Sequence, residues 1–188
     1  MTKHFMNRYS LIFSPTEKVK RIYLAATSSA LLSSIYLDAG ATSRIADAEI
    51  SSVNGTPCFT ISQTEEKRNG QPLLGALSIS DLSVKPATKV WSFVMSGGGK
   101  VPLSSKICLL YGDIPQGANG MPAPELQTGR VYSIFLNGRP DDPSDPTYGY
   151  RGKFCIVATS TGERKIIAIG SDTPAWKQDS CTEHSLIR

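Results

Sequence analysis

One stretch, residues 126–136, limits the possible fold of this chain more than any other: it reads LQTGRVYSIFL. A leucine, a glycine turn and a tyrosine at the start of an alternating run are typical of the corner where a β-sandwich chain passes between its sheets. In such a corner the tyrosine hydroxyl bonds to backbone a few residues upstream. Because strand side chains alternate, we expect Tyr132, Ile134 and Leu136 to face a core and the residues between them to face the other side. The stretch therefore predicts an all-β sandwich.

Short β-like runs separated by turn residues continue from residue 48 onward. They are residues 50–53, 58–62, 73–82, 89–95, 106–111, 130–137, 153–159 and 165–169. The run at 106–111 is apolar after Lys106, so we expect a central strand there, whereas residues 64–72 are expected to be a charged loop. No convincing helical period occurs after the leader. About seven or eight short strands at this spacing favour an immunoglobulin-like or fibronectin-like β-sandwich.

Two motifs have both a structural and a functional interpretation. Trp91 alternates with Phe93 and Met95, which favours a core side chain over a ring presented to a ligand. The glycines at 97–99 precede Lys100, and such a loop can bind phosphate through its amides. The motif lacks the nucleotide-binding frame and the hydroxyl residue after the lysine, so we expect a turn between strands.

The N-terminal residues have the pattern of a secretory signal. A basic group at residues 18–21 is followed by uncharged residues 22–37 and then by Asp38-Ala39-Gly40-Ala41. A basic start, a short apolar middle and a small-x-small end favour export with cleavage after Ala41, and Ala46-Asp47-Ala48 is a second candidate. We therefore expect a signal helix in residues 1–41, a β-sandwich domain with a polar tail in residues 42–188, and no stable membrane span after signal removal. An uncleaved anchor and an ordinary buried helix remain alternatives.

Charge and histidine content exclude several classes of function. The net charge of +4 lies mainly in the leader: residues 1–41 carry five basic and two acidic side chains. A nucleic-acid-binding protein keeps such charge on its folded surface, so no nucleic-acid partner is expected. The two histidines, His4 and His184, lie near the chain ends. This placement argues against a Ser-His-Asp or Cys-His hydrolase and against zinc, and no metal, cofactor or catalytic residue is predicted.

Four cysteines follow the leader: Cys58, Cys108, Cys155 and Cys181. An even count in a small exported domain predicts two disulfides, and the absence of a Cys-x-x-Cys pair weakens a redox or zinc interpretation. Three pairings are possible. We favour Cys58–Cys108, because the two lie in similar runs, and Cys155–Cys181, because these two are close in sequence.

The segment 141–150, DDPSDPTYGY, has the most distinctive surface composition. Asp141, Asp142 and Asp145 are acidic groups able to steer a basic partner, and Tyr148 and Tyr150 are candidate anchors beside them. The segment is also consistent with a stiff solvated loop. A calcium site is a third interpretation, although the carboxylate spacing matches no known calcium loop.

Several motifs together resemble a group of small exported enterobacterial proteins, the type VI secretion immunity periplasmic lipoproteins. The motifs are the leader, residues 57–61, 90–93 and 108–112, the glycine-tyrosine corner, and residues 150–155. The resemblance covers about residues 49–170, and it implies a protein that binds an incoming periplasmic toxin and blocks it by steric fit. The chain departs from the lipoprotein pattern because no cysteine follows the apolar leader.

The leading functional hypothesis is therefore an exported, periplasmic or secreted, non-catalytic protein that binds another protein, such as a type VI secretion toxin. The alternative is a structural or adhesive β-sandwich subunit of the cell surface or of a pilus, which usually carries an incomplete sheet. An enzyme is a third hypothesis. It would need an acidic pair, for instance among Asp113, Asp141, Asp142 and Asp145.

Overall fold

The structure is a computed structural model that describes residues 43–181. The chain divides into residues 1–41 and residues 42–188, and every described residue belongs to the second unit. The expected signal helix, its cleavage after Ala41 and both histidines lie outside the described residues.

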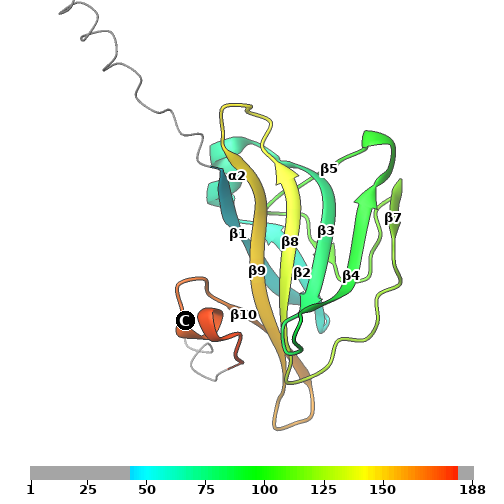
Figure 1. The fold of residues 1–188 in the computed structure, drawn as a ribbon, viewed down its shortest axis with the longest axis vertical. Helices are drawn as coiled ribbons and strands as arrows, with labels where there is room; N and C mark the ends of the chain where they lie inside the picture. Colours follow the sequence, from blue (N-terminus) through cyan, green and yellow to red (C-terminus); the bar gives the residue numbers. More distant parts are fainter. Residues whose placement is uncertain (1–42, 182–188) are drawn as a thin grey trace, which may run out of the picture. The chain divides into compact units, whose positions relative to one another are not determined.

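Strands dominate the described residues (Figure 1). They are β1 (Arg44–Val53), β2 (Thr56–Ile61), β3 (Leu73–Asp81), β4 (Thr88–Met95), β5 (Val101–Pro102), β6 (Leu109–Leu110), β7 (Ala118–Gly120), β8 (Val131–Arg139), β9 (Thr147–Ala158) and β10 (Arg164–Ile169). Short helical elements are α2 (Gln63–Asn69), η2 (Ser96–Gly98) and α3 (Pro174–Gln178). The all-β prediction is confirmed.

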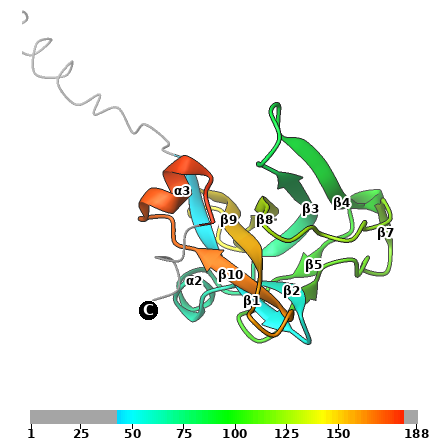
Figure 2. The ribbon, with the colours of Figure 1, turned by 90° about the horizontal axis from the view of Figure 1, so that it is seen from below.

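The strands form one continuous sheet rather than the two separate sheets expected for a sandwich. Its order is β6-β2-β1-β9-β8-β3-β4-β7, with β10 beside β9 and β5 beside β3. β1 and β9 are parallel, whereas the other neighbours are antiparallel. Because β1 pairs with β9 through Arg44–Asp47 and with β2 through Ala48–Val53, it carries the chain from one side of the core to the other. Figure 2 shows the resulting curl, with β2 opposite β3 and β4.

The core lies inside this curl and joins side chains from β2, β3, β4, β8 and β9. Trp91 is 0% exposed, which confirms its assignment to the core. The tyrosine corner is also confirmed: the Gln127 N–H donates to the Tyr132 hydroxyl at 2.8 Å, and Tyr132, Ile134 and Leu136 face the core. The Tyr132 ring stacks on Phe154, with 5.4 Å between ring centroids.

Two local predictions are wrong. Residues 106–111 are not a central strand, because only Leu109–Leu110 join the sheet, at its β2 edge, and Ile107 is 56% exposed. Residues 64–72 are not wholly a loop, because α2 occupies Gln63–Asn69. The signal for α2 was the spacing of Ser62 and Glu65: the Ser62 hydroxyl accepts the Glu65 N–H at 3.1 Å and caps the helix, as in a capping box. The glycines at 97–99 form the expected turn, between β4 and β5.

Two disulfides, Cys58–Cys108 and Cys155–Cys181, follow the pairing that the sequence favoured. Each closes a loop of tens of residues, and loops of that size correspond to about 3–4 kcal/mol of stabilisation through restriction of the unfolded chain. Two disulfides indicate an oxidising, extracytoplasmic environment. Within residues 43–181 no helix is long and apolar enough to cross a membrane.

We predict that Tyr132→Phe lowers the free energy of unfolding by about 0.5–1.5 kcal/mol, because it removes the hydrogen bond from the Gln127 N–H while keeping the ring contact with Phe154. Urea unfolding followed by circular dichroism measures the change. Tyr148→Phe is the matched control, since the Tyr148 hydroxyl makes no hydrogen bond with another described residue. Equal stability of the two variants would contradict a structural role for the corner hydroxyl.

Candidate functional site

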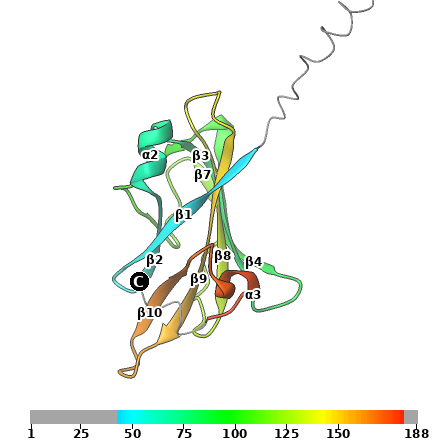
Figure 3. The same cartoon turned by 90° about the vertical axis from the view of Figure 1, so that its left-hand side faces the viewer.

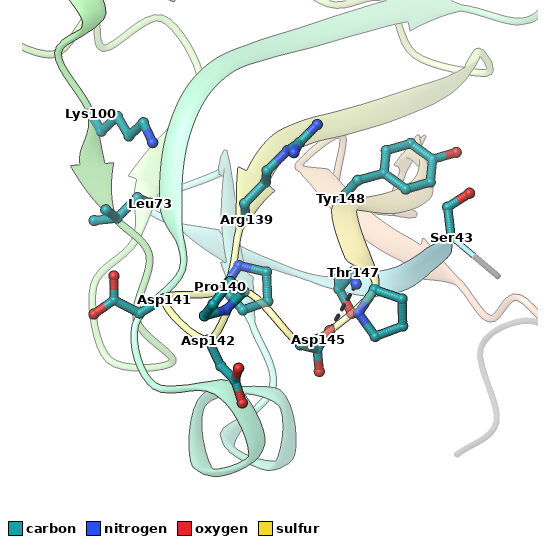
Figure 4. A pocket seen from close by; sticks show the side chains of 12 residues that line it. Ser43, Leu73, Lys100, Arg139, Pro140, Asp141, Asp142, Asp145, Thr147 and Tyr148 are labelled. Carbon is teal, nitrogen blue, oxygen red and sulfur yellow. Dashed lines mark hydrogen bonds between the residues drawn. The ribbon is translucent and has the colours of Figure 1, made fainter. Parts of the chain in front are cut away.

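The segment singled out in the sequence forms one wall of a cleft of about 700 Å³. We call residues 140–146, between β8 and β9, the Asp-Pro loop, and the cleft beside it the loop cleft. Figure 4 shows the lining side chains gathered from the loop, β3, β8, β9 and the residues flanking β1 and β5. The lining residues are Ser43, Leu73, Lys100, Arg139, Pro140, Asp141, Asp142, Pro143, Asp145, Pro146, Thr147 and Tyr148.

Asp141 and Asp142 are the exposed acidic groups of the loop cleft. Asp142 Oδ1 accepts the Ser144 hydroxyl at 2.7 Å and the Ser144 N–H at 2.8 Å. These two hydrogen bonds lower the pKa of Asp142 below its ordinary value. The side chain therefore stays ionised and also holds the loop in a local turn, a common use of aspartate.

Asp145 lines the same cleft, but its carboxylate is held by the protein. Its side chain is 6% exposed and lies 3.3 Å from Arg68 Nε. Its Oδ1 accepts the Thr147 N–H at 2.8 Å, the bond drawn in Figure 4. Burial raises the pKa of Asp145, but the hydrogen bonds from Thr147 and the positive charges of Arg68 and Arg44 outweigh it, so the pKa is lowered overall. Asp145 thus anchors the loop.

The two tyrosines lie on opposite faces of β9, so Tyr150 is not a partner anchor. Tyr150 is 0% exposed and belongs to the core, whereas Tyr148 is half-exposed and lies 6.4 Å from Phe135 between ring centroids. The cause is an irregularity in the β1–β9 ladder: Arg44 pairs with Thr147 but Ile45 pairs with Gly149. The extra residue, Tyr148, interrupts the alternation and turns its ring to the outer face.

Helix α2 lies beneath the Asp-Pro loop and fixes it to the rest of the sheet (Figure 1). Arg68 pairs with Asp145, as described above. Glu65 pairs with Arg44, with Arg44 Nη1 to Glu65 Oε2 at 2.7 Å, and Arg44 Nη1 also donates to the Thr147 hydroxyl at 3.0 Å. The loop is therefore held at its Asp145–Thr147 end by β1 and α2 together. Nothing in the sequence indicated these contacts; the only related pattern was the Ser62 cap that predicts the start of α2.

A third contact of α2 extends to the segment after β5. Glu66 accepts the Ser105 hydroxyl, the Ser105 N–H at 3.0 Å and the Ser104 hydroxyl at 3.0 Å. The pKa of Glu66 falls to about 2, mainly because of the Ser105 hydroxyl bond and then the Ser105 N–H bond. The short α2 thus joins three segments that are distant in sequence.

The geometry gives little support to a metal or a compact acidic pair. Among residues 43–181 no group of three histidine, cysteine or acidic side chains is placed to hold a metal ion. The carboxylates of Asp142 and Asp145 accept protein donors. Asp113 is not part of the loop cleft.

Fold and site define the class: a disulfide-linked, extracytoplasmic all-β protein with a curled mixed sheet and a loop-built surface cleft. No protein-family model, curated protein sequence or solved structure matches the chain.

The lowered pKa of Glu66 makes stability depend on pH. A carboxyl whose folded pKa lies below its ordinary value of 4.5 stabilises the fold above that value and loses this contribution as pH falls toward about 2. We therefore expect the difference in urea midpoint between the parent protein and Glu66→Gln to shrink between pH 5 and about pH 2. Glu163→Gln, an exposed control in the β9–β10 turn, measures the effect of removing a charge alone. A difference that is constant with pH would contradict the assignment.

Proposed function

We propose that this protein is an exported, periplasmic binding protein that acts without catalysis, and that the loop cleft is its contact surface for another protein. The observation that carries the proposal is the Asp-Pro loop itself. It presents two exposed carboxylates and a half-exposed tyrosine at a cleft while its base is fixed to β1 and α2.

The physical properties of the loop suit protein recognition. Its prolines and its internal hydrogen bonds limit the conformations that it can adopt, so little ordering entropy is lost on binding. Asp141 and Asp142 are exposed and can attract a basic partner surface, and Tyr148 offers an aromatic anchor beside them. Lys100 and Arg139 add opposite charges in the same cleft, which would make recognition selective for charge position.

The resemblance to the immunity group suggests the partner class: a toxin delivered into the periplasm, blocked by steric fit. An extracytoplasmic environment is consistent with that role. The candidate to test is any toxin encoded by a neighbouring reading frame, since such pairs are expected to be produced together.

We predict that the double substitution Asp141→Asn and Asp142→Asn weakens binding of that toxin by about 10-fold to 100-fold, as expected for the loss of charged contacts worth about 1.4–2.8 kcal/mol. Asparagine keeps the side-chain oxygen that accepts from Ser144, so the turn should persist. Titration calorimetry measures the affinity, and survival of cells that export the toxin measures protection.

Asp113→Asn is the matched control, because it removes an exposed carboxylate outside the loop cleft. We expect it to bind and protect like the parent protein. If the parent protein itself neither binds nor protects against the neighbouring toxin, the immunity role is wrong. If the double variant binds as tightly as Asp113→Asn, the loop cleft is not the contact surface.

Processing is also testable, because the two candidate cleavage points differ in what they leave of β1. Cleavage after Ala41 keeps all of β1, whereas cleavage after Ala48 removes Arg44 and Ala46, which is 4% exposed, together with the β1–β9 pairing. We expect mass spectrometry of the periplasmic protein to give an N-terminus at Thr42. A protein expressed from Glu49 should unfold at lower urea concentration than one expressed from Thr42, and equal midpoints would contradict the role assigned to β1.

A further inference from the structure

A second surface arises where β1 and β10 share one edge of β9. β1 pairs with Thr147, Gly149, Tyr150 and Arg151, and β10 pairs with Lys153–Ala158 on the same edge. Beyond Asp47, β1 leaves β9 and pairs with β2 instead. Figure 3 shows β1 running diagonally away from β9 toward β2, on the side of the molecule where β10 also lies. No ladder joins β1 to β10 within the described residues.

The edge of β1 that faces away from β2 carries unpaired backbone groups. In an antiparallel ladder, residues in alternate pairs direct both N–H and C=O away from the partner strand. The Pro57 carbonyl accepts the Tyr111 N–H at 2.9 Å and so points away from β1. Its register partner Ser52 then belongs to an outward pair, as do Ile50 and Ala48 further along. Ala48 still borders the β9 ladder, whose last pair is Asp47 with Arg151, so the unpaired groups begin beyond the Ala48 N–H; Ala48 and Ile50 both line a groove beside β10.

The same argument identifies the free groups of β10. The Ile156 carbonyl accepts the Gly129 N–H at 2.7 Å and therefore points away from β10. Its register partner Ile166 belongs to an outward pair, and so does Ala168 two residues on. The backbone donors and acceptors of Ile166 and Ala168 thus lie on the edge of β10 that β9 does not cover.

A groove of about 310 Å³ lies between these two strands. We call it the strand groove; it is lined by residues 47–51, Thr60, residues 151–153, residues 168–171 and Trp176. Backbone edges from two strands in one groove are the arrangement that an added β-strand satisfies.

The side chains of the strand groove have an uneven charge. Lys153 is neutralised by Asp179, at 2.7 Å, and it lies with Arg151 over the ring of Trp176, at 4.7 and 5.5 Å from the centroid. On the opposite wall, Asp47 accepts only the Ser171 hydroxyl at 2.5 Å. Glu49 makes no hydrogen bond or ion pair with another described residue. The acidic side chains of the groove that make no ion pair therefore lie along β1, and Arg151, the register partner of Asp47, is the one basic lining residue beside them without an ion pair among the described residues.

We propose that the strand groove accepts an extended segment of a partner protein, which adds to the free edge of β10 as a β-strand and places lysine or arginine side chains against Asp47 and Glu49. Two features of the groove indicate this kind of partner. The unpaired main-chain groups of β10 suit an extended backbone, and the carboxylates of Asp47 and Glu49 suit basic side chains. This surface is distinct from the loop cleft, so its test does not depend on a toxin.

Other edges of the sheet are less suited to strand addition. The strand path ends at β6 and β7, which span only Leu109–Leu110 and Ala118–Gly120. Very short edge strands are a common protection against pairing with other chains. β10 spans Arg164–Ile169, so it offers a longer edge, and one that opens into a groove.

The experiment uses the disulfide-intact protein from Thr42 to Arg188 and two acetylated ten-residue peptides, one alternating valine and lysine and the other alternating valine and glutamate. Amide hydrogen exchange by NMR reports binding at each residue. At a peptide concentration of ten times Kd, mass action predicts about tenfold slower exchange at the bound amides. We expect the lysine peptide to protect Ile166 and Ala168 and the glutamate peptide to protect neither.

Three variants test the two parts of the proposal. Ala168→Pro removes a groove-facing N–H without removing a bond to β9, so it should abolish protection. Ser52→Pro is its matched control, because the substitution lies on the same free edge of β1 outside the groove lining, and it should bind normally. The double variant Asp47→Asn and Glu49→Gln should weaken lysine-peptide binding by about tenfold or more, as expected for the loss of exposed charge contacts. This variant tests the proposal even if the proline variants fold poorly.

Protection at Ile166 and Ala168 by the lysine peptide, with loss in the charge variant, supports the proposal. Protection by both peptides equally, protection only at β6 or β7, or no protection by either peptide overturns it. Concentration-dependent protection of the same amides without peptide would assign the groove to a second copy of this chain instead. These results are read at Ile166 and Ala168 without a toxin, so failure of this proposal is distinguishable from failure of the proposed function.

Discussion

The parallel pairing of β1 with β9 is the constraint on which the rest of the structure depends. Two parallel strands cannot be joined by a hairpin and need a long connection. Here that connection contains β2 to β8, and β9 then returns to lie beside β1. Because β1 then passes from β9 to β2, the sheet curls over the core and brings β2 to its opposite side (Figure 2). A shift of this register by one residue would expose Ala46 and bury Ile45, and it would lose the Arg44–Thr147 contact.

Features encoded by local periodicity could be predicted from the sequence. The tyrosine corner and the buried Trp91 are examples, because an alternating run shows directly which side chains share a face. The sheet order could not be predicted in this way, since the β1–β9 pairing joins Arg44 to Thr147 and leaves no pattern in either segment. Residues 106–111 show the same limit: an apolar run indicates burial, but these residues are half-buried or exposed, because Leu109–Leu110 form an edge strand held at Cys108 by the disulfide to Cys58.

In the candidate site, too, features encoded by local sequence could be predicted, whereas features that depend on a neighbouring strand or helix could not. Acidic residues next to prolines predict exposed turns, and Asp141 and Asp142 are exposed at the loop cleft. Tyr150 was assigned to the wrong face because the single extra residue at Tyr148 reverses the alternation, and an irregularity of this kind depends on the neighbouring strand. The role of Asp145 depends on Arg68, a residue on a helix whose capping signal was present in the sequence but whose position beside the loop was not.

Both proposed surfaces use β1, and this has a thermodynamic consequence. Arg44 holds the base of the Asp-Pro loop, while Asp47 and Glu49, further along the same strand, form one wall of the strand groove. An inserted strand needs about 4.8 Å on each side for its own ladders, whereas Cα atoms of β1 and β10 approach within 8 Å of each other, so full insertion moves β1. Any such movement also shifts Arg44 relative to Thr147 and changes the loop cleft. Linkage requires the effect to be reciprocal. If strand insertion weakens the binding of a partner at the loop cleft, that partner weakens strand insertion by the same free energy.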